Sequence, residues 1–145
     1  MRLPILFLLS TLLTSCGEPL SMIPGGALSG EVQPAPSEWA DVAEVIQVET
    51  RPDNPYSINI WAVGIDTDLY FATGEDGTTW SAYVEIDNHV RARVNSSLHE
   101  FTAVTVTDPE ERESVEAAYL SKYELDPEDN WVSTGIIYRL DRRNE

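Results

Sequence analysis

The sequence contains a single cysteine, Cys16, so no intramolecular disulfide can support the folded chain. Stability must therefore come from a hydrophobic core. A chain of 145 residues with 42% hydrophobic residues, four Trp, six Tyr and three Phe is large enough to bury one. The same composition is too apolar for a chain that is disordered throughout. We therefore expect one globular domain, without internal repeats.

The N-terminal segment has the pattern of a secretory signal. Arg2 supplies a positive charge, and residues 3–13 are almost wholly apolar. This run is shorter than the roughly 20 residues that a membrane-spanning helix needs, and it is typical of a signal peptide. We assign residues 1–15 to the signal peptide.

Leu13-Thr14-Ser15-Cys16 resembles the lipobox, the processing motif of bacterial lipoproteins. The resemblance implies that the Cys16 thiol receives a diacylglycerol, that cleavage makes Cys16 the N-terminus, and that an acyl chain is then added. Stable anchoring takes more than one chain, at about 0.8 kcal/mol for each buried methylene. The alternatives are an ordinary signal peptide with a chance cysteine, and a buried N-terminal helix. In Gram-negative lipoproteins an Asp directly after the Cys is associated with retention in the inner membrane. The resemblance, with Gly17 at that position, therefore implies the outer membrane if the cell is Gram-negative.

The chain carries 25 acidic and nine basic residues, which gives a net charge of −16. Such a charge favours solubility and disfavours nucleic acid, whose backbone needs a basic surface. It also disfavours a polybasic contact with anionic lipid headgroups. We therefore expect no nucleic-acid partner, and we expect the membrane to be reached through the lipid anchor.

Residues 16–37 are predicted to form the lipidated N-terminus and a flexible linker. They are rich in proline and glycine and show no helical or strand period. A flexible chain of this length spans roughly 25 Å, which would hold the domain just off the membrane. The globular domain is expected at residues 38–145, opening with a helical turn capped by Ser37.

The rest of the sequence predicts about six strands and two helices. Thr78 can cap a short helix, and Asp108 followed by Pro109 starts a second helix that ends near Glu124. The predicted strands are residues 44–50, 56–65, 69–73, 90–94, 98–107 and 134–140. The expected fold class is mainly β with α (α+β), a small antiparallel β-barrel with two helices packed outside it.

Several short motifs follow one another in a suggestive order. They are Ile60-Trp61-Ala62-Val63, Asp68-Leu69-Tyr70, Thr73-Gly74, Trp80 and Ala118-Tyr119-Leu120-Ser121-Lys122-Tyr123. Over roughly residues 45–142 the chain resembles the FMN-binding split-barrel superfamily, and within it the small deazaflavin-dependent nitroreductase-like proteins. The resemblance implies a split β-barrel, often a homodimer, with FMN or deazaflavin at the barrel edge. The cofactor-facing positions that it implies are Trp61, Tyr70, Thr73, Gly74 and Trp80.

The chain departs from this family where the cofactor phosphate is expected. Cofactor-binding relatives tend to be basic after the second hairpin strand, whereas this chain has Thr73-Gly74-Glu75-Asp76-Gly77, whose carboxylates repel a phosphate. Arg91 and Arg93 share a strand face and could compensate, although a solvated strand face is the simpler interpretation. Lys122 is interpreted as a surface residue of its helix.

The leading hypothesis is therefore a lipoprotein whose domain is a binding or structural module without a cofactor. The alternative is a flavin- or deazaflavin-dependent oxidoreductase. No catalytic residue and no metal site is predicted, because His89 and His99 lack a paired ligand motif and no Gly-x-Ser-x-Gly elbow occurs. The two histidines are expected to be surface residues that neighbour each other across a hairpin. The aromatic residues are interpreted as core: Trp61, Tyr70, Trp80, Tyr119 and Tyr123.

Overall fold

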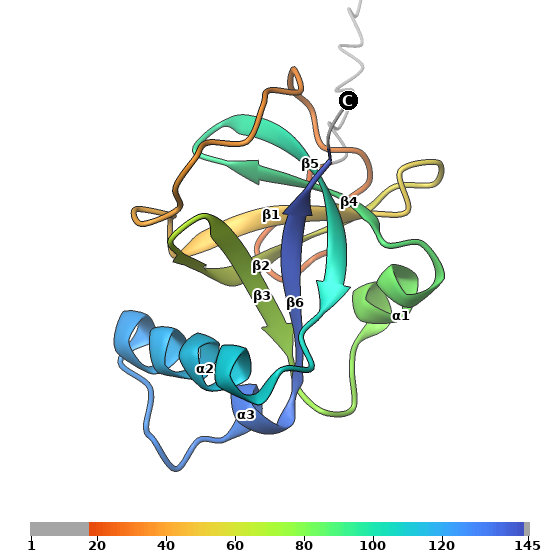
Figure 1. Ribbon diagram of the computed structural model, residues 1–145. Coiled ribbons are helices and arrows are strands. Elements are labelled where there is room, and N and C mark those ends of the chain that lie inside the picture. The colour runs from red at the N-terminus through yellow and green to blue at the C-terminus, as the bar shows by residue number, and fades with distance from the viewer. Residues whose placement is uncertain (1–17, 144–145) are drawn as a thin grey trace, which may run out of the picture.

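Six strands and three helices make up residues 18–143, the part of the chain that the computed structural model describes (Figure 1). The predicted signal peptide and Cys16 lie outside these residues. The strands are β1 (Val45–Thr50), β2 (Tyr56–Ile65), β3 (Asp68–Thr73), β4 (His89–Val94), β5 (Ser97–Thr105) and β6 (Ile136–Arg142). The helices are α1 (Thr79–Ile86), α2 (Pro109–Tyr123) and α3 (Trp131–Thr134).

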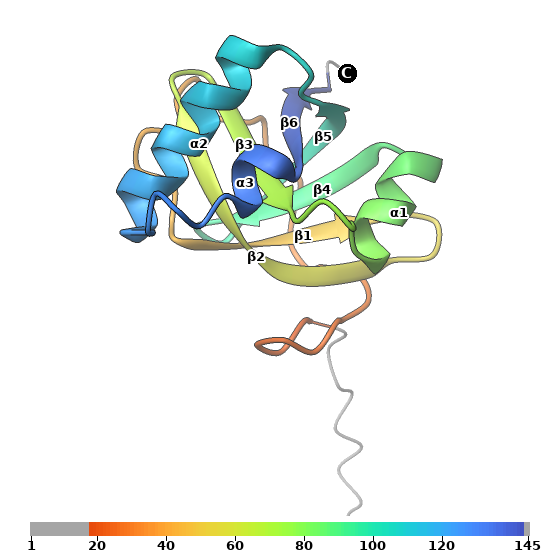
Figure 2. The same ribbon diagram turned by 90° about the horizontal axis from the view of Figure 1, so that it is seen from below.

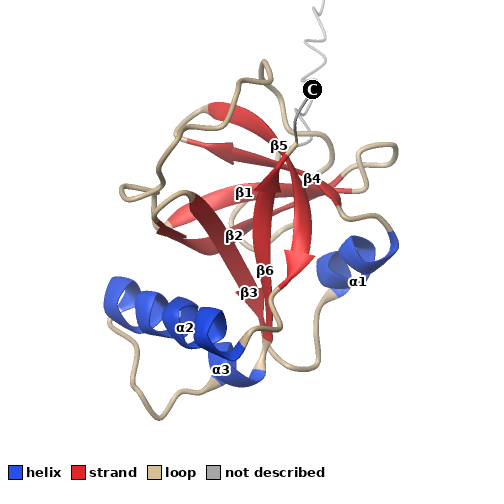
Figure 3. Ribbon diagram, in the orientation of Figure 1, coloured by secondary structure: helices blue, strands red, loops and turns tan. Residues whose placement is uncertain are grey.

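The strands form a closed barrel in the order β1-β2-β3-β6-β5-β4, and β4 pairs back with β1. Every neighbouring pair is antiparallel. Closure leaves no free sheet edge in the barrel. The helices lie outside the strands, with α2 and α3 together and α1 apart from them (Figures 2 and 3). The predicted fold class, a mainly β barrel with packed helices, is confirmed.

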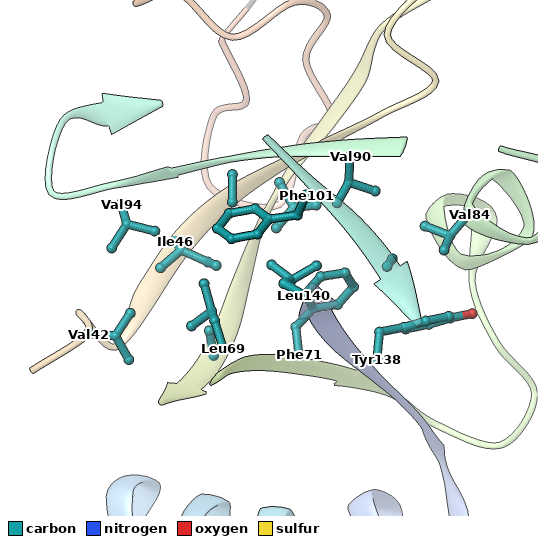
Figure 4. Close-up of a cluster of buried hydrophobic side chains, with 14 of the residues drawn as sticks. Val42, Ile46, Leu69, Phe71, Val84, Val90, Val94, Phe101, Tyr138 and Leu140 are labelled. Atoms are coloured by element: carbon teal, nitrogen blue, oxygen red, sulfur yellow. The ribbon is translucent and has the colours of Figure 1, made fainter. Parts of the chain in front are cut away.

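Alternation along the strands fills the barrel. In β4, Val90, Ala92 and Val94 point inward, whereas Arg91 and Arg93 point outward, as the period of two requires. Figure 4 shows the interior cluster, in which aromatic rings from β3, β5 and β6 meet aliphatic side chains from β1 and β4. A second cluster lies between the barrel wall and α2 and is built from these residues: Val63, Tyr70, Ala72, Val106, Val115, Tyr119, Val132 and Ile137.

The two predicted helices begin directly after the capping residues that the sequence indicated. Thr78 and Ser81 form a capping box at the start of α1. Asp108 caps α2, Pro109 occupies its first turn, and Glu124 ends it in a left-handed conformation.

The prediction of a strand from residue 134 was wrong at its start, because Trp131–Thr134 forms the short helix α3 before β6 begins. A distant side chain stabilises this turn. The Arg112 guanidinium donates to the carbonyls of Ser133 and Gly135 at 2.9 and 2.7 Å. The prediction failed because strand propensity depends on neighbouring residues and takes no account of a contact from α2.

The segment predicted as a flexible linker lies against the barrel over its described residues. Leu28 is buried, and its backbone N–H donates to the Glu49 carboxylate at 2.6 Å. Further along, the Gln33 N–H donates to the Leu98 carbonyl. No helix forms at Ser37. Proline and glycine exclude regular structure here, but they do not prevent hydrogen bonding to neighbouring strands.

Candidate functional site

Trp61 lines an apolar groove on the outside of the barrel. It lies on the outer face of β2, and its ring stacks on Tyr123 with 4.5 Å between ring centroids and 12° between planes. The groove has a volume of about 520 Å³, and Met22, Val45 and Trp131 are among the other residues that line it. Two tryptophans and a methionine give it the character of an apolar binding surface.

Tyr70 and Thr73 lie elsewhere on β3. Tyr70 is buried in the cluster beneath α2, and its hydroxyl donates to the Glu111 carboxylate at 3.0 Å. Burial, and then the neighbouring Glu111, raise the pKa of Tyr70 well above its usual value. Thr73 is buried where β3 pairs with Ile136. Both are held by packing, and neither lines the groove.

Trp80 belongs to the barrel interior. Its ring contacts Phe71 and Tyr138 at centroid distances of 5.2 and 5.8 Å. Gly74 has open space around it and begins the hydrogen-bonded turn that leads to Gly77. The five positions implied by the family resemblance are therefore divided among the outer groove, the α2 interface, the barrel interior and a turn.

The C-terminal end of α2 is fixed to the barrel by polar contacts. Lys122, which we interpreted as a surface residue, instead donates through Nζ to the carbonyls of Val42, Ala43 and Ala62 at 2.7–2.9 Å. Burial lowers the pKa of Lys122. Beside it, the Tyr123 hydroxyl accepts from the Ala62 N–H at 2.9 Å, and burial raises the pKa of Tyr123 to about 12. These contacts give the Lys-Tyr pair of α2 a structural role.

The outer face of β4 is not the simple solvated face that the sequence suggested. The Arg91 guanidinium makes two parallel hydrogen bonds of 2.8 Å to the Glu49 carboxylate, which is fully buried. Arg93 pairs with the Glu18 carboxylate and with the Gln47 side chain. Both arginines are therefore paired within the chain, Arg91 with Glu49 of β1 and Arg93 with Glu18 of the N-terminal segment.

A flavin phosphate requires cationic side chains or free backbone amides. No Lys or Arg occurs between Arg51 and Arg91. At the start of α1, Thr78 and Ser81 already satisfy each other's backbone N–H groups. The residues present at the expected phosphate position therefore do not fit this group.

The other described cations are also engaged within the chain. The Arg51 guanidinium lies 3.7 Å from the centre of the Tyr83 ring, with its Nε unpartnered, and Arg139 pairs with Glu111 and Asp141. The remaining three donate to carbonyl or hydroxyl oxygens: Arg112, Arg142 and Arg143. Binding an anion at any of them would require an internal contact to be given up.

The two histidines do not neighbour each other across the β4–β5 hairpin, where His89 pairs with Thr102 and His99 with Ala92. His99 is buried, contrary to expectation, and its Nδ1 lies 2.9 Å from the Gln33 carbonyl oxygen. Within residues 18–143, no cluster of three or more His, Cys, Asp or Glu side chains is arranged to hold a metal. Over the same residues, no helix has the length and apolar character to span a bilayer.

No protein-family model and no curated protein matches the sequence. Solved structures match in fold. A provisionally assigned pyridoxamine 5'-phosphate oxidase of Listeria innocua aligns with a TM-score of 0.56 and 15% identity, covering 70% of this chain and 86% of its own. A provisionally assigned 5-nitroimidazole antibiotic resistance protein of Bacteroides thetaiotaomicron has a TM-score of 0.56 and 13% identity, with 70% and 74% covered.

A FAD-binding protein of Mesorhizobium loti aligns with a TM-score of 0.53 and 14% identity, covering 70% of this chain and 83% of its own. At such identities the likeness concerns the fold alone. The chain thus has the six-stranded barrel fold found in these flavin-binding and pyridoxamine-phosphate-oxidase-like proteins, as the motif resemblance led us to expect.

Proposed function

We propose that this chain is a lipid-anchored protein of the bacterial cell envelope whose barrel serves as a binding or structural module without a flavin. One observation supports the absence of a flavin. The position expected for a cofactor phosphate has an acidic turn and a helix start whose N–H groups are already bonded. The anchor is supported by the signal-like N-terminus and by the lipobox that ends at Cys16.

The groove beside Trp61 is the surface on which such a module would bind. Its lining is mainly apolar and includes Trp131 and Met22, and a concave apolar surface is the usual form of a binding site. Asn59 also lines the groove, and its side-chain amide donates to the Pro19 and Ser21 carbonyls.

The second candidate is a flavin- or deazaflavin-dependent oxidoreductase, and the family that its motifs resemble implies a homodimer. Only the barrel fold favours it, through its likeness to a FAD-binding protein. Fold alone does not carry function, because function depends on the site. Residues 52–90 contain no Lys or Arg, so the expected phosphate position lacks the cation that this candidate requires.

The anchor is tested by the intact mass of the protein purified from its own host's membranes. We expect a chain that begins at Cys16 and carries a diacylglycerol and one further acyl chain, in the outer-membrane fraction. The Cys16→Ser variant should retain residues 1–15 and gain no lipid mass, because the thioether has no sulfur on which to form. A mature wild-type chain without lipid, or one that begins at another residue, contradicts the proposal.

A further inference from the structure

Exposed apolar side chains gather on one side of the barrel. Leu20 and Ile23 pair across a tight turn, and Met22 at its tip is 95% exposed. Met22 lines the groove together with Val45 and Trp61, which is 42% exposed. These five residues form what we call the apolar face. Figure 2 shows the turn as an orange-red loop that projects beyond β2. Contiguous exposed apolar surface of this kind marks an interaction site.

The N-terminal end of the described chain is fixed to the barrel beside this face. The Glu18 carboxylate pairs with Arg93. The Asn59 side-chain amide donates to the Ser21 carbonyl at 2.8 Å, which holds the turn against β2. Two residues of extended chain reach at most about 7 Å. A lipid on Cys16 would therefore enter the bilayer close to Glu18, beside the apolar face, and not at the end of a long tether.

The net charge of the chain indicates which kind of lipid surface the apolar face can contact. The chain has a net charge of −16, which opposes contact with anionic headgroups. Tryptophan is favoured at the boundary between headgroups and hydrocarbon, where its ring is part apolar and part polar. Glu44 is exposed next to Val45, and a carboxylate there limits how deeply the face can enter. These features fit shallow contact with zwitterionic lipid.

We propose that the apolar face rests on the bilayer that holds the Cys16 lipid, with Met22 and Trp61 at the level of the headgroups. This inference rests on the proposed function, because the lipid brings the face to the membrane. Docking closes the groove with lipid. α1 meets the opposite end of β2 from Trp61, through the contact of Tyr83 with Tyr56, and is left directed to the aqueous phase.

The test uses the full lipidated chain reconstituted in phosphatidylcholine vesicles and isolated by flotation. Met22→Cys is labelled with a nitroxide, and Ile86→Cys serves as the matched control because Ile86 is also an exposed apolar residue, at 84%, but lies on α1. We expect the label at position 22 to collide more with oxygen, which concentrates in lipid, than with a water-soluble nickel chelate. The label at position 86 should show the reverse.

A second readout keeps the native side chains. Brominated phosphatidylcholine should quench part of the tryptophan fluorescence of the native chain, because Trp61 and Trp131 line the groove whereas Trp39 and Trp80 are buried. The quenching should fall in Trp61→Phe, and most of it should be lost when Trp131→Phe is added.

Each other outcome overturns the inference in a distinguishable way. A chain that does not float with vesicles removes the anchor, and docking fails with it. A chain that floats while position 22 is as water-accessible as position 86 retains the anchor but excludes docking. Spin–spin broadening between labels at position 22 would show that a second copy of the chain covers the face in place of lipid.

Discussion

Replacing Arg91 with alanine is expected to destabilise the barrel by about 3–5 kcal/mol, the cost of leaving a buried charge without its partner. Glu49 is fully buried on β1, and Arg91 makes two hydrogen bonds to its carboxylate. The same carboxylate accepts from the Leu28 N–H, so the N-terminal segment should also loosen. Urea denaturation followed by circular dichroism measures the loss of stability.

Two variants separate this charge effect from side-chain truncation. Arg143→Ala removes an exposed arginine whose contact is a 3.3 Å hydrogen bond to Thr102, and its stability should change by less than about 0.5 kcal/mol. In the double variant Glu49→Leu with Arg91→Met, both charges are absent, so its stability should exceed that of Arg91→Ala. It should stay below that of the wild type, because the Leu28 N–H loses its acceptor. If the double variant were as unstable as Arg91→Ala, the loss of stability in Arg91→Ala would not come from leaving the Glu49 charge unpaired.

Phe71→Ala should cost about 3–5 kcal/mol, because a large aromatic ring is removed from a close-packed interior. Phe71 is fully buried on β3, and its ring contacts Trp80 and Tyr138. Phe71 and Tyr138 belong to the interior cluster that also contains Val84 of α1 (Figure 4). The measurement is the shift of the urea midpoint at an unchanged slope.

Ile86→Ala is the matched control for this loss. Ile86 is apolar but exposed on α1, so its truncation removes little buried surface and should change stability by less than about 0.5 kcal/mol. If Phe71→Ala were as mild as Ile86→Ala, the ring cluster would not be the packed core described above.

The elements that sequence predicted well are those specified by neighbouring residues. Alternation along Val90–Val94 identifies β4 without knowledge of its partners. Asp108 and Pro109 likewise set the start of α2 through groups within one helical turn. The closed barrel followed from the number and spacing of such strands.

What could not be predicted depends on contacts between distant parts of the chain. Lys122 contacts the Val42 carbonyl 80 positions earlier in the sequence. Arg93 contacts Glu18 across 75 positions, and this ion pair fixes a segment that composition alone describes as flexible. Such pairs leave no periodic signal, since a single charged residue looks the same whether it faces water or a partner.

The candidate site was foreseen only in part. The family resemblance brought Trp61 into consideration, and the structure places it in the apolar groove. Met22 was missed because it lies in the segment predicted as linker, and Trp131 because it lies outside every predicted strand and helix. Leu20, Met22 and Ile23 stand together in a segment rich in proline and glycine, and this apolar group was the available signal.

The central claim is our proposal that this barrel, although it shares the fold of flavin-binding proteins, binds no flavin at its acidic turn, residues 73–77. Titrating FMN and, separately, a deazaflavin cofactor into the purified full-length protein tests it most directly. We expect the fluorescence of each cofactor to stay unchanged at equal concentrations of cofactor and chain, and the protein to remain colourless. A saturable fluorescence change at one cofactor per chain, or a yellow protein as purified, would contradict the claim.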